Sequence, residues 1–183
     1  MGMFDDVLNK VGESYGGKGF EYGTHEVIIG EVEAKQRDTK NTKDCAAIEV
    51  VVFDEKDNDK TATATLWFHT EGAAKMSVTK VLGLLVHKVG EEKKEIVRET
   101  GKKLFGSITD FTQARDVAAK LMGEKLVGQK GFAVAEPNGN YTTTSYVDLW
   151  HYPATPQSDE PAADDPLAGA EDVTEEVDIP DEL

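Results

Sequence analysis

The feature that most constrains the fold is a change in the spacing of apolar residues along the chain. Apolar and polar residues alternate in 25–36 and 61–69, and 45–53 is rich in Val and Ile, so these segments are predicted as β-strands. Between about residues 73 and 122 the apolar residues recur instead at helical spacing. Strand composition then returns in 125–135 and 141–152, on either side of a tight-turn signal at Asn138-Gly139.

This order of elements predicts a mainly β fold with a helical insert. Three strands, a helical section and a final hairpin are the order of a five-stranded OB-fold-like Greek-key barrel, and closure would remove exposed strand edges. A helix-capped open sheet is the structural alternative. In the first strand Ile28, Gly30, Val32 and Ala34 are predicted to share one face, and Gly30 indicates a bulge or sharp bend.

The helical insert is expected to contain three helices. They are predicted at residues 73–87, 91–100 and 113–122. The last has an apolar stripe and is predicted to end at Gly123. The stripe consists of Val117, Ala118, Leu121 and Met122.

Charge divides the chain into a nearly neutral body and an acidic tail. Of the 35 Asp and Glu, eleven lie in residues 156–183, which contain no Lys or Arg, so the formal charge of −15 describes mainly the tail. We therefore expect a flexible leader (1–23), a folded domain (24–155) and a disordered tail, because a segment so poor in apolar residues cannot offset its ordering entropy. The opening residues lack a secretory signal and no apolar run reaches the ~20 residues of a membrane span, so a cytoplasmic protein without a membrane partner is expected.

Motifs for catalysis or metal binding fail on their context. Residues 12–19 nearly match a phosphate-binding loop but have Gly19 where the hydroxyl ligand belongs, and the Asp54-Glu55 pair leads directly into a hairpin. The four His and the single Cys45 show no metal-ligand spacing, and Cys45 is expected to be a buried reduced thiol. We expect no cofactor, no metal and no enzymatic activity.

A basic loop is predicted after the first strand. It contains Lys35, Arg37, Lys40 and Lys43 within nine residues. In OB-folds the loop between strands one and two flanks the ligand groove, where mobile cations contact phosphates without reading sequence. The alternative is a solvated hairpin loop whose Asp38 and Asp44 partly cancel the charge.

Aromatic residues are predicted on the polar faces of the strands. Trp67 alternates with the apolar Leu66 and Phe68 and should therefore point away from the core, where a base can stack on it. Phe53 and Tyr146 are candidates for the same face, and Tyr141 lies at the tip of the final hairpin. The alternative is that the helical insert covers these aromatic side chains.

The acidic tail carries part of a family resemblance. Its end, Asp178-Ile179-Pro180, is similar to the tip of bacterial single-strand-binding proteins, although Asp181-Glu182-Leu183 replaces their terminal Phe. With the strand order of 25–152, the chain resembles phage-encoded single-stranded DNA-binding proteins. The resemblance implies an OB-fold, coating of single-stranded DNA without sequence preference, and recruitment of replication or recombination proteins through residues 178–183.

Two other functions remain open from the sequence. A protein-interaction adaptor or inhibitor would act through the tail without nucleic acid, and removing residues 156–183 would abolish its partner binding. A phage structural or decoration protein would assemble symmetrically without a ligand.

Overall fold

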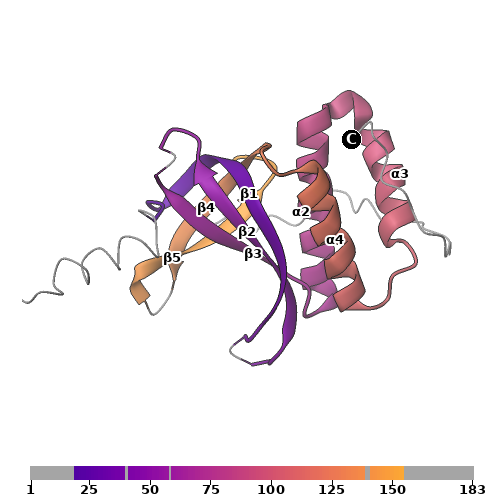
Figure 1. Ribbon diagram of the computed structural model, residues 1–183, viewed down its shortest axis with the longest axis horizontal. Helices are drawn as coiled ribbons and strands as arrows, with labels where there is room; N and C mark the ends of the chain where they lie inside the picture. Colours follow the sequence, from indigo (N-terminus) through magenta and orange to yellow (C-terminus); the bar gives the residue numbers. More distant parts are fainter. Residues whose placement is uncertain (1–18, 40, 58, 139–140, 155–183) are drawn as a thin grey trace, which may run out of the picture.

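The computed structural model describes residues 19–39, 41–57, 59–138 and 141–154, with the backbone alone at 137–138 and 141–146. A curved sheet lies beside a group of helices (Figure 1). The elements in chain order are β1 (Gly23–Arg37), β2 (Cys45–Asp54), β3 (Thr61–Trp67), α2 (Glu71–Val89), the 3-10 turn η1 (Glu91–Lys93), α3 (Lys94–Phe105), α4 (Phe111–Lys125), β4 (Lys130–Asn138) and β5 (Tyr141–Trp150).

The five strands form one antiparallel sheet in the order β3-β2-β1-β4-β5. The central strand β1 is long enough to pair with β2 over one part of its length and with β4 over another. The predicted sequence of three strands, helices and a hairpin is thereby confirmed. The helices are as extensive as the strands, so the fold is mixed rather than mainly β.

The sheet curls, but within the described residues it does not close into the predicted barrel. Cα atoms of β3 and β5 approach within 8 Å, yet these two strands are the ends of the hydrogen-bonded order. Helix α2 contacts both of them: Ser77 Oγ donates to the Trp67 carbonyl oxygen at 2.7 Å, and Lys80 Nζ donates to Asp148 of β5 at 2.6 Å. We attribute the open seam to α2, which joins the two end strands through its side chains.

A bulge in β1 changes which residues face the core. The β1–β2 register shifts between Ile29 and Val32, which confirms the irregularity predicted at Gly30. Because of the shift, Ile29 before it and Val32 after it both pack on the core. Ile28 pairs with Phe53 on the opposite face, so its predicted place beside Val32 is wrong.

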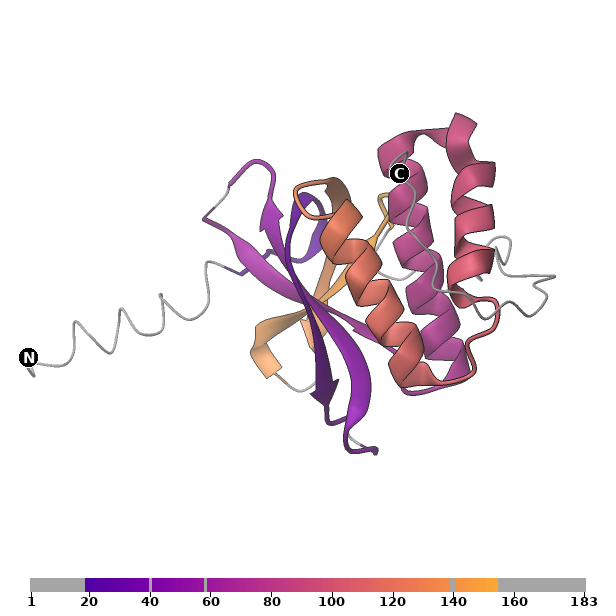
Figure 2. The same cartoon turned by 45° about the vertical axis from the view of Figure 1, so that its right-hand side comes forward.

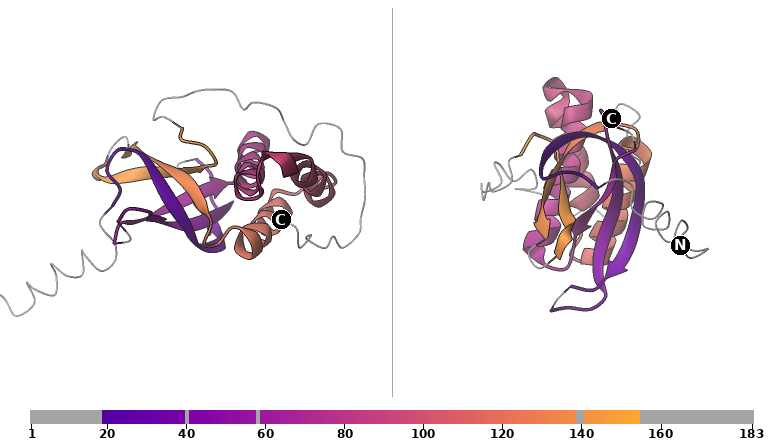
Figure 3. Two further views of the ribbon diagram at one scale, coloured as in Figure 1. Left: turned by 90° about the horizontal axis from the view of Figure 1, so that it is seen from above. Right: turned by 90° about the vertical axis from the view of Figure 1, so that its left-hand side faces the viewer.

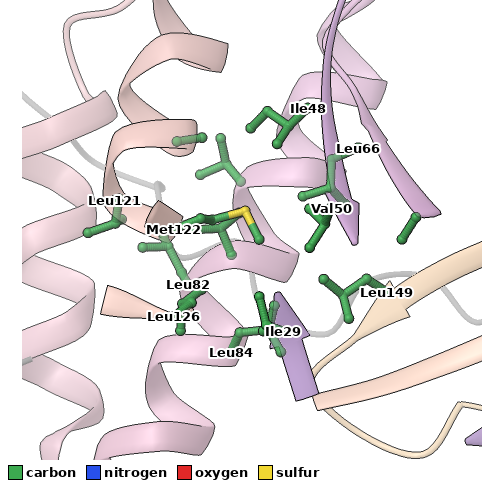
Figure 4. Close-up of a cluster of buried hydrophobic side chains, with 14 of the residues drawn as sticks. Ile29, Ile48, Val50, Leu66, Leu82, Leu84, Leu121, Met122, Leu126 and Leu149 are labelled. Carbon is green, nitrogen blue, oxygen red and sulfur yellow. The ribbon is translucent and has the colours of Figure 1, made fainter. Parts of the chain in front are cut away.

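The core lies between the concave side of the sheet and the helices α2 and α4 (Figure 4). The sheet contributes buried aliphatic residues such as Ile48, Val50 and Leu66, and α4 contributes Leu121 and Met122. The predicted stripe of α4 is confirmed. The helix continues beyond its predicted end at Gly123 to Lys125, and β4 begins only at Lys130. Burial of this apolar surface is the main source of stability for such a layered fold.

Helix α3 is the helix farthest from the sheet, and it packs on α2 (Figures 2 and 3). Its Gly101 permits the close approach, because a Cβ there would lie 2.7 Å from Leu82 Cδ1 of α2. No helix in the described part of the chain is long and apolar enough to cross a membrane.

Candidate nucleic-acid interface

The candidate surface is the side of β2 and β3 that faces away from the helices, here called the outer face. Its residues alternate along each strand with the core residues, as a β-strand requires. The register places Ala47 opposite Trp67, Glu49 opposite Thr65, Val51 opposite Thr63 and Phe53 opposite Thr61. Thr63 is exposed, and Val51, Phe53, Thr65 and Trp67 are half-buried.

Trp67 is the last residue of β3 and lies at the end of this face from which the chain leads into α2. Its chain neighbours Leu66 and Phe68 are buried in the core, so the indole points away from the core as predicted. The ring contacts His69 edge to face, with 5.6 Å between ring centroids. The buried residues of α2 and α4 pack on the opposite side of β2 and β3, and Trp67 and Phe53 keep part of their surface accessible.

Phe53 lies at the other end of the same face. Its ring occupies the space where Gly30 of β1 lacks a side chain, since a Cβ at Gly30 would overlap Phe53 Cε2. Phe53 lies six positions along β2 from Ala47, the partner of Trp67, which corresponds to about 20 Å of strand. The structure therefore places both aromatic residues on one face, but not in contact.

The two tyrosines of the predicted site belong to β5. The backbone of Tyr146 pairs with Glu136, and that of Tyr141 pairs with Asn138. Their side chains lie outside the described part of the structure. Whether Tyr146 joins Trp67 and Phe53 stays a prediction.

Two of the four predicted basic residues lie on strand β1 rather than in the loop. The strand continues to Arg37, so Lys35 and Arg37 lie two positions apart at its end. Across the sheet, Lys35 pairs with Ala47 and Ala47 pairs with Trp67. Lys35, Ala47 and Trp67 thus form one row on the outer face, with the small Ala47 in the middle. Two strand spacings, about 10 Å, separate the ends of this row.

The remaining cations of the predicted loop are placed only in part. Lys43 is exposed in the β1–β2 connection, and Lys40 lies outside the described residues. Asp44, which has a positive φ of 51°, donates its backbone N–H to Asp38 Oδ1 at 3.0 Å. Asp38 and Asp44, the acids that offset the positive charge of this loop, therefore also shape it.

Glu49 is the residue that the sequence prediction missed. It lies on the outer face of β2, and its carboxylate binds both Lys35, at 2.8 Å, and Arg37. Lys35 Nζ also contacts Glu33 at 2.9 Å. The available signal was a single acid in the apolar strand 45–53, but its partners depend on the β1–β2 register.

A second tryptophan, Trp150 on β5, has a different environment. Lys80 Nζ lies 4.0 Å from the centroid of the Trp150 ring and binds Asp148. Burial lowers the pKa of Lys80, while the charge and hydrogen bond of Asp148 oppose this shift. One face of Trp150 is therefore occupied within the fold, which makes it a useful control for Trp67.

Asp54, the first residue of the Asp54-Glu55 pair, has a structural role in the fold. Asp54 accepts hydrogen bonds from the backbone of Lys56 and Asp57, at 2.8 and 3.1 Å, and contacts His25 Nδ1 at 2.9 Å. Asp54 thus shapes the β2–β3 hairpin. Among the described residues, no group of three His, Cys, Asp or Glu could hold a metal ion. Cys45 is buried and free, as predicted. The loop 12–18 and the tail motif 178–183 lie outside the described residues.

One pocket lies away from the outer face, between the start of α2, the end of α3 and the start of α4. It has a volume of about 370 Å³ and a mainly apolar lining that includes Val78, Phe105 and Phe111. Of its acids, Asp110 caps α4 by accepting from Gln113 N at 2.8 Å, and Glu71 pairs with Lys75. Both acids of the lining therefore already have structural partners.

No protein-family model and no curated protein matches the chain.

Proposed function

We propose that the chain binds single-stranded DNA without sequence preference, through the outer face of β2 and β3. The observation that carries the proposal is the position of Trp67: half-buried, on the side of the sheet opposite the helices, and in one row with Lys35. Stacking on an aromatic ring suits every base, and cations beside it bind the phosphates. Together these are the requirements of a binder that tracks the backbone.

The fold supports this proposal at the level of strand order. We propose that the sheet is a form of the OB-fold in which the closing β3–β5 pair is missing. The order β3-β2-β1-β4-β5, with helices between β3 and β4, suits this assignment. In that fold the β2–β3 face and the adjoining loops bind oligonucleotides.

In this arrangement the single-stranded DNA would cross the outer face between Trp67 and Phe53. About 20 Å separates the two, so they would contact bases that are not neighbours in the strand. Lys35, Arg37 and Lys43 would lie beside the phosphates near Trp67. The acidic residues 178–183 would recruit replication or recombination proteins.

The test is a titration of fluorescently labelled oligo(dT) with the full chain, followed by anisotropy at low and moderate salt. Stacking on one ring contributes about 1–3 kcal/mol per base, so Trp67→Leu should weaken binding by about fivefold or more. Trp150→Leu is the matched control and should change the affinity less than twofold. Circular dichroism verifies that both variants are folded.

Two results would contradict the proposal. The first is the absence of binding by the folded wild-type chain at low salt, after which the tail should be used as bait for a protein partner. The second is an equal loss in the Trp67 and Trp150 variants. Deleting residues 156–183 separates the remaining alternative: a DNA binder keeps or gains affinity for oligo(dT), whereas an adaptor loses its partner.

A further inference from the structure

Glu49 is an acid in the middle of a surface proposed to bind a polyanion. The residue is 7% exposed, and it lies on a strand whose other residues are almost all apolar. The register places it beside the row of Lys35, Ala47 and Trp67, one step along the outer face. Burial of a carboxylate at this position is unfavourable unless cations accompany it.

Both cations of that region bind Glu49. Its carboxylate contacts Lys35 Nζ at 2.8 Å and also Arg37. The side chain of Glu49 is 9% exposed, against 36% for Lys35 and 52% for Arg37. The carboxylate is therefore covered, while both cations keep a side that is open to solvent.

The charges of this cluster nearly cancel. Lys35, Arg37 and Glu49 together carry one net positive charge, and the pairing of Lys35 with Glu33 offsets that charge too. A phosphate that approaches the open sides of Lys35 and Arg37 would meet a much weaker field than two free cations produce. Glu33 is largely exposed, with a side-chain exposure of 57%, so solvent screens it more than it screens Glu49.

We propose that Glu49 regulates the affinity of the nucleic-acid site by neutralising Lys35 and Arg37. This inference rests on the proposed function and adds a residue that limits it: the buried carboxylate keeps binding weak and its salt dependence shallow. The site would thereby release single-stranded DNA readily, because fewer phosphates are neutralised than its basic residues suggest. Glu49 acts through the charges of the two cations and makes no contact with the DNA itself.

The decisive variant is Glu49→Gln in the full chain, measured with labelled oligo(dT) over a series of salt concentrations. It keeps the shape of the side chain and removes its charge. We expect binding to tighten by about fivefold at low salt, which corresponds to about 1 kcal/mol. The slope of log affinity against log salt should become steeper by about 0.7, the value for one additional neutralised phosphate on a single strand.

Glu31→Gln is the control for net charge. It removes the same charge from an exposed position on β1 for which the described residues show no ion pair. Its affinity for oligo(dT) should stay within about twofold of that of the wild type, and its salt slope should not change. An equal gain in both variants would mean that only total charge matters, and it would overturn the role of Glu49.

The outcomes separate this inference from the proposed function. If the wild-type chain binds through Trp67 but Glu49→Gln binds equally or more weakly, only the inference is wrong, and Glu49 instead holds the cations in place for binding. If neither folded chain binds at any salt concentration, both are wrong. If circular dichroism shows that Glu49→Gln is unfolded, Glu33→Gln is measured instead, because it releases Lys35 from its exposed partner. A gain in affinity smaller than fivefold then supports the inference, and an unchanged affinity overturns it.

Discussion

Replacing Gly30 by Ala tests how the outer face is built. Phe53 lies across Gly30, and an added Cβ would overlap Phe53 Cε2 while lying 3.0 Å from the Val51 carbonyl oxygen. The carbonyl belongs to the paired strand and cannot move alone, so the Phe53 ring must shift outward. Overpacking of this kind costs about 1–3 kcal/mol. For a chain of 183 residues, that corresponds to a fall in Tm of about 2–4 °C per kcal/mol.

Gly123→Ala is the matched control, with the opposite expected sign. Gly123 lies inside α4, and a Cβ there would have no atom within 4 Å. The same chemical change should therefore stabilise the protein by about 0.5–1 kcal/mol, because alanine favours the helix and reduces the entropy of the unfolded chain. Urea unfolding followed by circular dichroism measures both values.

A double mutant identifies Phe53 as the cause. In a Phe53→Leu background the ring is gone, so Gly30→Ala should cost at least about 0.5 kcal/mol less than it does in the wild-type chain. A neutral or stabilising Gly30→Ala would contradict the expected overlap with Phe53. An equal cost with and without the Phe53 ring would contradict it as well.

Three further predictions concern groups that support the fold. Burial by itself would raise the pKa of Asp54, but hydrogen bonds from Lys56 N, His25 and Asp57 N outweigh it and lower the pKa below 3.8. The ionised carboxylate therefore stabilises the fold above that pH, and Asp54→Asn should lower the stability by about 1 kcal/mol at neutral pH. The variant should also lose less stability than the wild type as the pH falls through the folded-state pKa of Asp54, measured by thermal melts across pH 2–6. Asp148→Asn leaves the buried Lys80 without its ion pair and should cost about 2–3 kcal/mol in urea at pH 7, with a deficit that shrinks as the pH approaches 10.5, since neutral Lys80 needs no partner. Asp110→Ala removes the N-cap of α4 and should cost about 1 kcal/mol, measured by the same unfolding transition.

The order of elements could be predicted because it depends on local patterns. Alternation in 61–69 and helical spacing in 113–122 are properties of one segment, and both segments form the predicted type of structure, with ends displaced by a few residues. The side of the sheet on which Trp67 lies followed from its apolar neighbours Leu66 and Phe68. Such information is contained in the sequence of each strand alone.

Relations between strands were harder to predict. A bulge at Gly30 was expected, but not that it would reverse the face on which Ile28 lies. The role of Glu49 depends on the register that brings the end of β1 beside it, and the open β3–β5 seam depends on the side-chain contacts of α2. These features arise from tertiary contacts between segments distant in sequence, which periodicity does not record.

Photo-crosslinking of oligo(dT) to the full chain, with the modified peptides identified by mass spectrometry, shows which surface contacts single-stranded DNA. We expect adducts on the outer face, in the peptides that contain Trp67 and Phe53, and we expect them to disappear when salt prevents binding. Adducts confined to the helices, for example around Phe111 at the apolar pocket, would contradict the assignment of the outer face as the nucleic-acid interface.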